Sequence, residues 1–104
     1  MIYFGKTDVG KKRKGNQDNF GIYRLADNVL LLAVCDGMGG ANGGNIASEA
    51  AVKVISDKLT SGYHVGMNDN SVKNLLISSV DAANITLYSM ANNNEDLSGM
   101  GTTV

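Results

Sequence analysis

The chain has 104 residues, of which 43% are hydrophobic and 18% charged, and its formal net charge is −1. This length limits it to one domain, and the nearly balanced charge gives no electrostatic reason to expect a nucleic-acid or membrane partner. A single cysteine, Cys35, excludes an internal disulfide and fits a reducing compartment. Because no apolar run approaches the roughly 20 residues that span a bilayer, and no signal-peptide pattern is present, the sequence predicts a soluble, cytoplasmic protein.

The N-terminal residues predict two strands separated by a loop. Residues 2–9 have modest β propensity, and the lysines and glycines of residues 10–16 predict a loop after them. Residues 19–25 alternate polar and apolar side chains around Phe20 and Ile22, a pattern typical of a strand with one buried face.

The next segment predicts the second strand of a hairpin. Residues 26–28 form a tight connection to residues 29–35, which are apolar on both faces and are therefore expected at the centre of a sheet. Residues 36–44 contain five glycines and predict a loop.

A first helix is predicted over residues 46–59, with Gly44 or Asn45 as its cap. Its alanine content indicates close packing against a sheet. Apolar side chains recur at helical spacing at Ala47, Ala51, Val54 or Ile55, and Leu59. Residues 61–70 predict a loop, because they include two glycines and several polar side chains.

The second helix has the clearest periodic pattern in the chain. Ser71 is a suitable N-cap, and three asparagines at residues 92–94 end the helix. The apolar stripe consists of Val72, Leu76, Val80, Ala83, Leu87 and Met90. Residues 99–104 have high β propensity and begin a further strand. A hairpin, two helices and a strand predict an α+β layered fold that lacks its second half.

Asp36 ends the apolar strand and precedes the glycine-rich loop. An Asp-Gly turn is the common structural explanation of such a pair, but residues 36–44 contain more glycine than a turn requires. A carboxylate at the end of a buried strand needs a partner, and nearby backbone without side chains suits a hard cation such as Mg²⁺ or Mn²⁺.

A second carboxylate, Asp18, is expected beside Asp36, because the hairpin returns the chain to the same end. Two carboxylates in one place repel each other unless a cation lies between them. A pair of divalent ions is a recurrent device for hydrolysing phosphate esters. Arg13, five residues before Asp18, carries a guanidinium that can bind two phosphate oxygens at once.

Three motifs in order resemble the metal-dependent protein phosphatases of type 2C, especially their bacterial branch. They are RKGNQD (residues 13–18), VCDGMGG (residues 34–40) and GTT (residues 101–103). The resemblance implies that Asp18, Asp36 and the Gly37 carbonyl bind metal and that Arg13 binds the substrate phosphate. It also implies two Mn²⁺ or Mg²⁺ ions and phosphoserine or phosphothreonine proteins as substrates, with a Ser/Thr kinase as a cognate partner.

The resemblance further implies a four-layer α-β-β-α sandwich, of which residues 1–104 are the N-terminal part. Family domains are more than twice this length and carry further metal-binding aspartates beyond the Gly-Thr-Thr strand. Two carboxylates should therefore bind a metal pair weakly, and the half-sandwich is expected to expose an apolar sheet face that favours self-association.

Position 38 is a further point of comparison with the family. Met38 stands where eukaryotic members commonly have a histidine proposed to protonate the leaving group, so that proton must come from water or another source. His64, the one histidine, is expected at the surface between the helices. Cys35 is expected to be a small core residue.

Two other functions remain open from the sequence. One is a non-catalytic remnant that keeps the phosphatase-like fold as a regulatory or binding module. The other is a nucleic-acid binder that uses the basic loop, although no aromatic stacking residues accompany its lysines. These lysines are Lys6, Lys11, Lys12 and Lys14.

Overall fold

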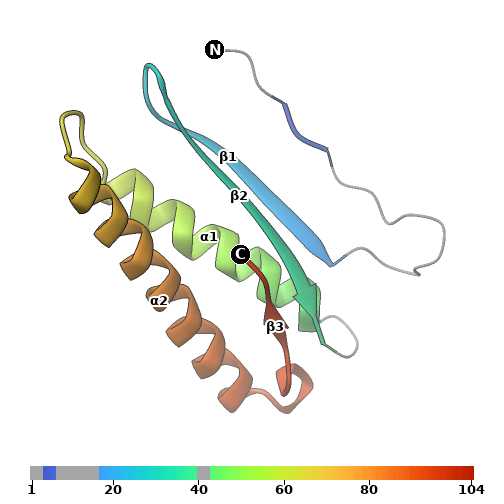
Figure 1. Ribbon diagram of the computed structural model, residues 1–104. Coiled ribbons are helices and arrows are strands. Elements are labelled where there is room, and N and C mark those ends of the chain that lie inside the picture. Colours follow the sequence, from blue (N-terminus) through green and yellow to red (C-terminus); the bar gives the residue numbers. More distant parts are fainter. Residues whose placement is uncertain (1–3, 7–16, 40–42) are drawn as a thin grey trace.

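The computed structural model describes residues 4–6, 17–39 and 43–104. Strands β1 and β2 are joined by a turn and are followed by two long helices, a short 3-10 helix η1 and strand β3 (Figure 1). Their bounds are β1 Asp18–Ala26, β2 Val29–Met38, α1 Gly43–Gly62, α2 Asp69–Asn93, η1 Glu95–Leu97 and β3 Gly101–Thr102. The sheet is antiparallel with the order β1-β2-β3. The predicted α+β class and the predicted hairpin with a central second strand are confirmed.

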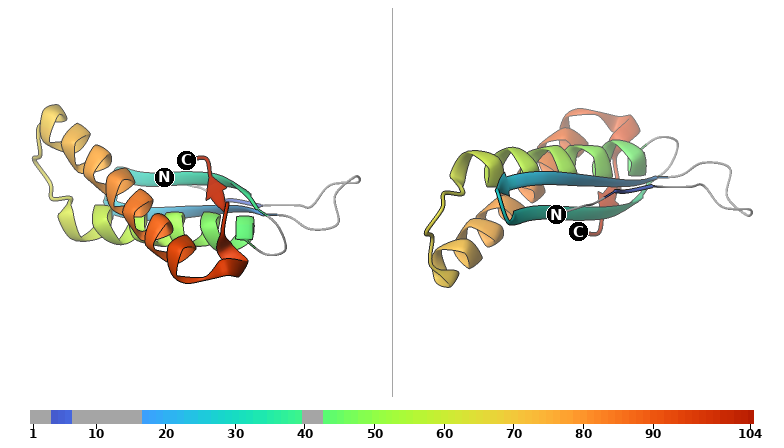
Figure 2. Two further views of the ribbon diagram at one scale, coloured as in Figure 1. Left: turned by 90° about the horizontal axis from the view of Figure 1, so that it is seen from below. Right: turned by 90° about the horizontal axis from the view of Figure 1, so that it is seen from above.

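Helix α1 lies along one face of the hairpin, and α2 crosses beside α1 at a steep angle (Figure 2). Helix α1 packs directly on β1 and β2, and α2 packs mainly on α1. Burial along β2 alternates strictly from Leu31 to Met38, so every second residue of the strand faces α1. Neither helix has a segment that is both long and apolar enough to cross a membrane, within the part of the chain that is described.

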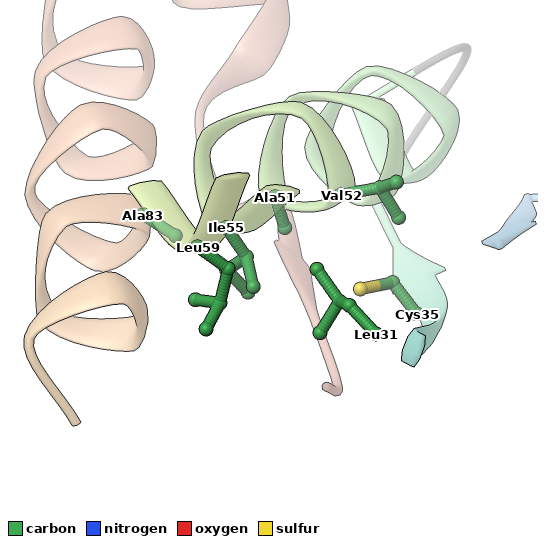
Figure 3. Close-up of a cluster of buried hydrophobic side chains, with 7 residues drawn as sticks. All are labelled: Leu31, Cys35, Ala51, Val52, Ile55, Leu59 and Ala83. Carbon is green, nitrogen blue, oxygen red and sulfur yellow. The ribbon is translucent and has the colours of Figure 1, made fainter. Parts of the chain in front are cut away.

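The core lies between β2 and the helices (Figure 3). The predicted helical spacing is confirmed on α1, where Ala47, Ala51, Ile55 and Leu59 are buried. Cys35 is fully buried, as predicted, and burial raises the pKa of its thiol, although a hydrogen bond with Thr102 partly opposes this shift. The core cluster consists of Leu31, Cys35, Ala51, Val52, Ile55, Leu59 and Ala83.

On the opposite side of the hairpin, no helix of the described residues covers the strands, and the side chains are largely exposed. Leu32, Val34 and Met38 retain 65%, 68% and 64% of their accessible surface. We call this surface, formed by Phe20, Ile22, Leu32, Val34 and Met38, the open face. Apolar residues exposed side by side on a strand indicate a surface that another element or molecule covers. The predicted uncovered apolar face is therefore present.

Strand β2 is longer than predicted. Asp36, Gly37 and Met38 belong to the strand, so the prediction that a loop begins at Asp36 is wrong. Pairing on both sides overrides the weak β propensity of glycine here: Asp36 pairs with β1, and Gly37 and Met38 pair with β3. The strand predicted over residues 2–9 is absent at Phe4–Lys6, and its remainder lies outside the described residues, as does the loop of residues 10–16.

Both helices differ from their predicted bounds. Helix α1 begins at Gly43 and ends at Gly62, beyond the predicted residues 46–59 at both ends.

On α2, Leu76 and Val80 are 42% and 41% exposed, so the predicted stripe does not face the core at those positions. The residues of α2 that pack inward are Leu75, Ser79, Ala83 and Leu87. The packing face is rotated because α2 contacts α1 along only one side.

The N-cap of α2 is Asn68, and the prediction of Ser71 was wrong. The backbone N–H of Ser71 donates to Asn68 Oδ1 at 2.8 Å, which places Ser71 inside the first turn. Both residues are good caps by type, and the start of the helix at Asp69 decides between them.

Replacing the cap is expected to destabilise the chain. Asn68→Ala should cost about 1 kcal/mol of unfolding free energy, because it leaves the Ser71 N–H without its acceptor. Urea denaturation followed by circular dichroism measures this. Ser71→Ala is the matched control and should change stability by less than about 0.5 kcal/mol. A larger loss for Ser71→Ala than for Asn68→Ala would contradict the assignment.

Candidate metal centre

The two acidic residues singled out from the sequence are direct partners in the sheet. Asp18, the first residue of β1, lies opposite Asp36 of β2 in the antiparallel register. Directly opposed residues point to the same side of a sheet, with Cβ atoms about 5 Å apart. Because Phe20 and Val34 form the next pair on that side, both carboxylates lie at one end of the open face. The prediction that the hairpin brings Asp18 and Asp36 together is confirmed.

Like charges directly opposite each other destabilise a sheet. A cation bound between the two carboxylates removes this repulsion. One oxygen of Asp18, Oδ1, is buried, whereas Asp36 is exposed. Carboxylate oxygens are the ligands that Mg²⁺ and Mn²⁺ prefer, so the donor set fits a hard divalent ion. Among the described residues, no group of three or more His, Cys, Asp or Glu side chains gathers to hold a metal.

Close backbone contact fixes the end of β2 that carries Asp36. A Cβ added to Gly37 would overlap the Gly44 carbonyl oxygen at the start of α1 and would lie 2.9 Å from the Gln17 carbonyl oxygen. A Cβ on Gly44 would lie 2.8 Å from the Met38 nitrogen. Glycine at both positions therefore allows β2 to pass directly against the N-terminus of α1.

Thr103, directly after β3, holds Asp36 from the other side. The Asp36 N–H donates to Thr103 Oγ1 at 2.9 Å, and the Thr103 N–H donates to the Asp36 carbonyl oxygen at 2.9 Å. These bonds use only the backbone of Asp36, so its carboxylate stays available on the open face. The Gly-Thr-Thr motif thus supports the acidic site through hydrogen bonds with the Asp36 backbone.

A groove of about 440 Å³ lies on the open face, next to Asp18 of the acidic pair. Its floor is apolar, with Phe20, Ile22, Leu32 and Val34, and Asp18 lies at its border. The segment Phe4–Lys6 lines the same groove. Asp18 therefore lies beside an apolar surface, whereas Asp36 is exposed to solvent.

The remaining predicted site residues have different positions. Gly37 follows Asp36 in β2, and its N–H donates to the Gln17 carbonyl oxygen at 3.1 Å. Arg13 lies outside the described residues, as do Lys11, Lys12 and Lys14. His64 is exposed in the connection between α1 and α2, as predicted.

Sequence reasoning missed a polar cluster beneath the acidic pair. Asn19 Nδ2 donates to Ser48 Oγ, and Ser48 Oγ donates to the Gln17 carbonyl oxygen next to Asp18. Ser48 lies on the buried side of α1 between Ala47 and Ala51, where a hydroxyl needs a partner. The sequence feature that could have revealed this cluster is a serine among the alanines on the buried side of α1.

Comparison with known proteins shows that the chain is similar to protein phosphatases. A family model described as protein phosphatase 2C matches residues 10–104. The serine/threonine phosphatase stp of Listeria monocytogenes is 36% identical over 101 residues, which cover 95% of this chain and 39% of the relative. Protein phosphatase PhpP of Streptococcus pneumoniae is 54% identical over 48 residues, covering 44% of this chain and 19% of the relative.

Solved structures agree with the sequence relatives. The serine/threonine phosphatase Stp1 from Staphylococcus aureus superposes with a TM-score of 0.81 at 33% identity, covering 94% of this chain and 38% of that chain. A bacterial serine phosphatase gives a TM-score of 0.80 at 33% identity, with 94% and 39% covered. The chain therefore has the architecture of part of these proteins and spans about 39% of the length of the curated relatives that match nearly all of it.

Proposed function

The chain belongs to the protein phosphatase 2C family, and from this we propose that it contributes to metal-dependent hydrolysis of phosphoserine and phosphothreonine in proteins. The observation that carries the proposal is the pairing of Asp18 with Asp36 across the hairpin. Two adjacent carboxylates, one of which lines a groove, can bind a cation, and a bound cation attracts a phosphate dianion. The family membership gives the reaction class.

In this proposal Asp18, Asp36 and the Gly37 carbonyl oxygen hold Mn²⁺ or Mg²⁺, two ions in a complete domain. The ions supply an activated water and neutralise charge on the phosphate. Arg13 binds and orients the phosphate through two hydrogen bonds. Met38, two residues after Asp36, has no ionisable proton, so water or another group protonates the leaving serine or threonine oxygen.

Residues 1–104 then form part of a phosphatase domain whose substrates are phosphorylated proteins in the cytoplasm. A Ser/Thr kinase that phosphorylates the same proteins is the cognate partner. A second candidate function is a non-catalytic module with a phosphatase-like fold. It is supported by the small ligand set, because only two carboxylates come together among the described residues.

Calorimetric titration of the 104-residue chain with Mn²⁺, combined with p-nitrophenyl phosphate hydrolysis, distinguishes these functions. Metal binding together with Mn²⁺-dependent hydrolysis supports the enzyme. Binding without hydrolysis supports the metal site and indicates that turnover needs groups beyond those of this chain. Absence of both supports the non-catalytic module and contradicts the proposed metal site.

We also expect the chain to self-associate through the open face. Val34 and Leu32 together present a mostly exposed apolar surface at the middle of the hairpin. Sedimentation velocity should show a concentration-dependent dimer or larger species. Val34→Lys should shift the chain to the monomer, whereas Asn74→Lys on the exposed side of α2 should not. A stable monomer of the unmodified chain at all concentrations would contradict this expectation.

A further inference from the structure

One buried hydroxyl joins the two residues on either side of Asp18. Ser48 Oγ, on α1, donates to the Gln17 carbonyl oxygen at 2.6 Å. Ser48 Oγ also accepts a hydrogen bond from Asn19 Nδ2 at 2.7 Å. Ser48 is fully buried, and Asn19 Nδ2 also lies 3.2 Å from Asn45 Oδ1. The backbone just before Asp18 and the side chain just after it are thus both fixed to α1.

The other two buried serines behave differently. Ser56 Oγ donates to the Lys53 carbonyl oxygen at 3.0 Å, and Ser79 Oγ donates to the Leu76 carbonyl oxygen at 2.7 Å. Bonds of this kind, to the preceding turn of the same helix, are the ordinary way in which a helical serine satisfies its hydroxyl. Ser48 also has such a contact, with the Asn45 carbonyl oxygen at 3.2 Å, but its shorter bond, at 2.6 Å, leaves the helix and goes to the Gln17 carbonyl oxygen directly before β1.

The Gln17 carbonyl, directly before β1, also forms hydrogen bonds with both α1 and β2. It accepts the Ser48 hydroxyl from α1 and the Gly37 N–H from β2, the latter at 3.1 Å. Gly37 directly follows Asp36, so a single carbonyl links the backbone next to one carboxylate with the backbone next to the other. This shared carbonyl therefore fixes the distance between Asp18 and Asp36, despite the repulsion between their carboxylates.

We propose that Ser48 and Asn19 are positioning residues of the acidic site, which hold Asp18 so that its carboxylate faces that of Asp36 and a divalent cation can bind both. The inference rests on the proposed function. Neither side chain touches the cation; both act on the backbone that carries its ligand. Groups that orient metal ligands in this way typically account for about 10–100-fold in metal affinity.

The test measures the Mn²⁺ dissociation constant of the full 104-residue chain and of its serine variants by calorimetry. Ser48→Ala should weaken Mn²⁺ binding at least about 10-fold. Ser79→Ala and Ser56→Ala are the matched controls, because each removes a buried hydroxyl from a helix without touching β1. These two should bind Mn²⁺ like the unmodified chain, even where thermal unfolding shows a similar loss of stability.

Asn19→Ala is the second variant and keeps the bond from Ser48 to the Gln17 carbonyl. It tests the proposal if Ser48→Ala does not fold, and it should also weaken Mn²⁺ binding. Unchanged Mn²⁺ affinity in a folded Ser48→Ala or Asn19→Ala chain overturns the inference. Equal losses in Ser48→Ala and Ser79→Ala also overturn it, because they indicate general destabilisation. If the unmodified chain binds no Mn²⁺, the proposed function itself fails, which is a distinct result.

Discussion

Asp36→Asn is expected to weaken Mn²⁺ binding at least about 100-fold and, at the same time, to stabilise the metal-free chain. Asparagine has nearly the shape of aspartate and keeps the backbone hydrogen bonds of residue 36 with Thr103. The substitution therefore removes the charge and leaves the strand intact. Since Asp18 lies directly opposite, loss of one charge relieves a repulsion of about 0.2–1 kcal/mol.

The metal-bound chain should respond in the opposite direction. Mn²⁺ at 100 times its dissociation constant would stabilise the unmodified chain by about 2.7 kcal/mol. The variant lacks a direct ligand and should bind at least about 100-fold more weakly, so this stabilisation disappears. A substitution that affects only packing is expected to change stability in the same direction with and without Mn²⁺. Opposite changes in the two conditions therefore indicate that Asp36 is a metal ligand.

Thermal unfolding with and without Mn²⁺ measures both effects in one experiment. Asp27→Asn, in the turn at the other end of the hairpin, removes the same charge from the chain and is the control. It should leave the Mn²⁺-dependent shift in Tm unchanged. A lower Tm of metal-free Asp36→Asn, or a Mn²⁺-dependent shift equal to that of the unmodified chain, would contradict the assignment of Asp36.

Gly37→Ala is expected to have the largest effect on folding. The added Cβ would overlap the Gly44 carbonyl oxygen. The backbone fixes the position of the Cβ, and the oxygen is itself a backbone atom, so neither can move aside by a change of rotamer. Overpacking in a core costs about 1–3 kcal/mol, and this site belongs at or above the upper end because the obstacle is main chain. Relief would require β2 and α1 to separate, which also exposes Cys35 and Ala47.

Urea denaturation of Gly37→Ala should show a loss of about 3 kcal/mol or the absence of a cooperative transition. Gly101→Ala in β3 is the matched control, because a Cβ there would lie 3.5 Å from Met38 Cγ, an ordinary contact. The control should remain within about 1 kcal/mol of the unmodified chain. Equal stability of the two variants would show that β2 does not pass α1 as closely as described.

Much of the fold could be predicted because its signals are local. Alternation around Phe20 and the apolar run from Val29 predicted the hairpin, and the spacing of Ala47, Ala51 and Leu59 predicted the packing face of α1. Three asparagines at residues 92–94 predicted the end of α2, which occurs at Asn93. Each of these features depends on residues within a few positions of one another.

The errors arose where distant residues decide the outcome. Asp36 to Met38 have a glycine-rich sequence typical of a loop, yet they are strand because β1 and β3 pair with them. Leu76 and Val80 have the right spacing for a core stripe, yet the contact with α1 selects the neighbouring face of α2. Ser71 and Asn68 are equally good caps by type, and the cap depends on where the helix begins.

The sequence by itself determined the types and order of the elements and the chemistry of Asp18 and Asp36, because periodicity and side-chain charge are properties of short segments. Only the tertiary structure decided that these carboxylates are direct partners in the register. It alone revealed that Ser48 from α1 binds the backbone beside Asp18. Hydrogen bonds between residues about 30 positions apart leave no periodic trace in the sequence, so they become visible only when the strands and helices are packed together.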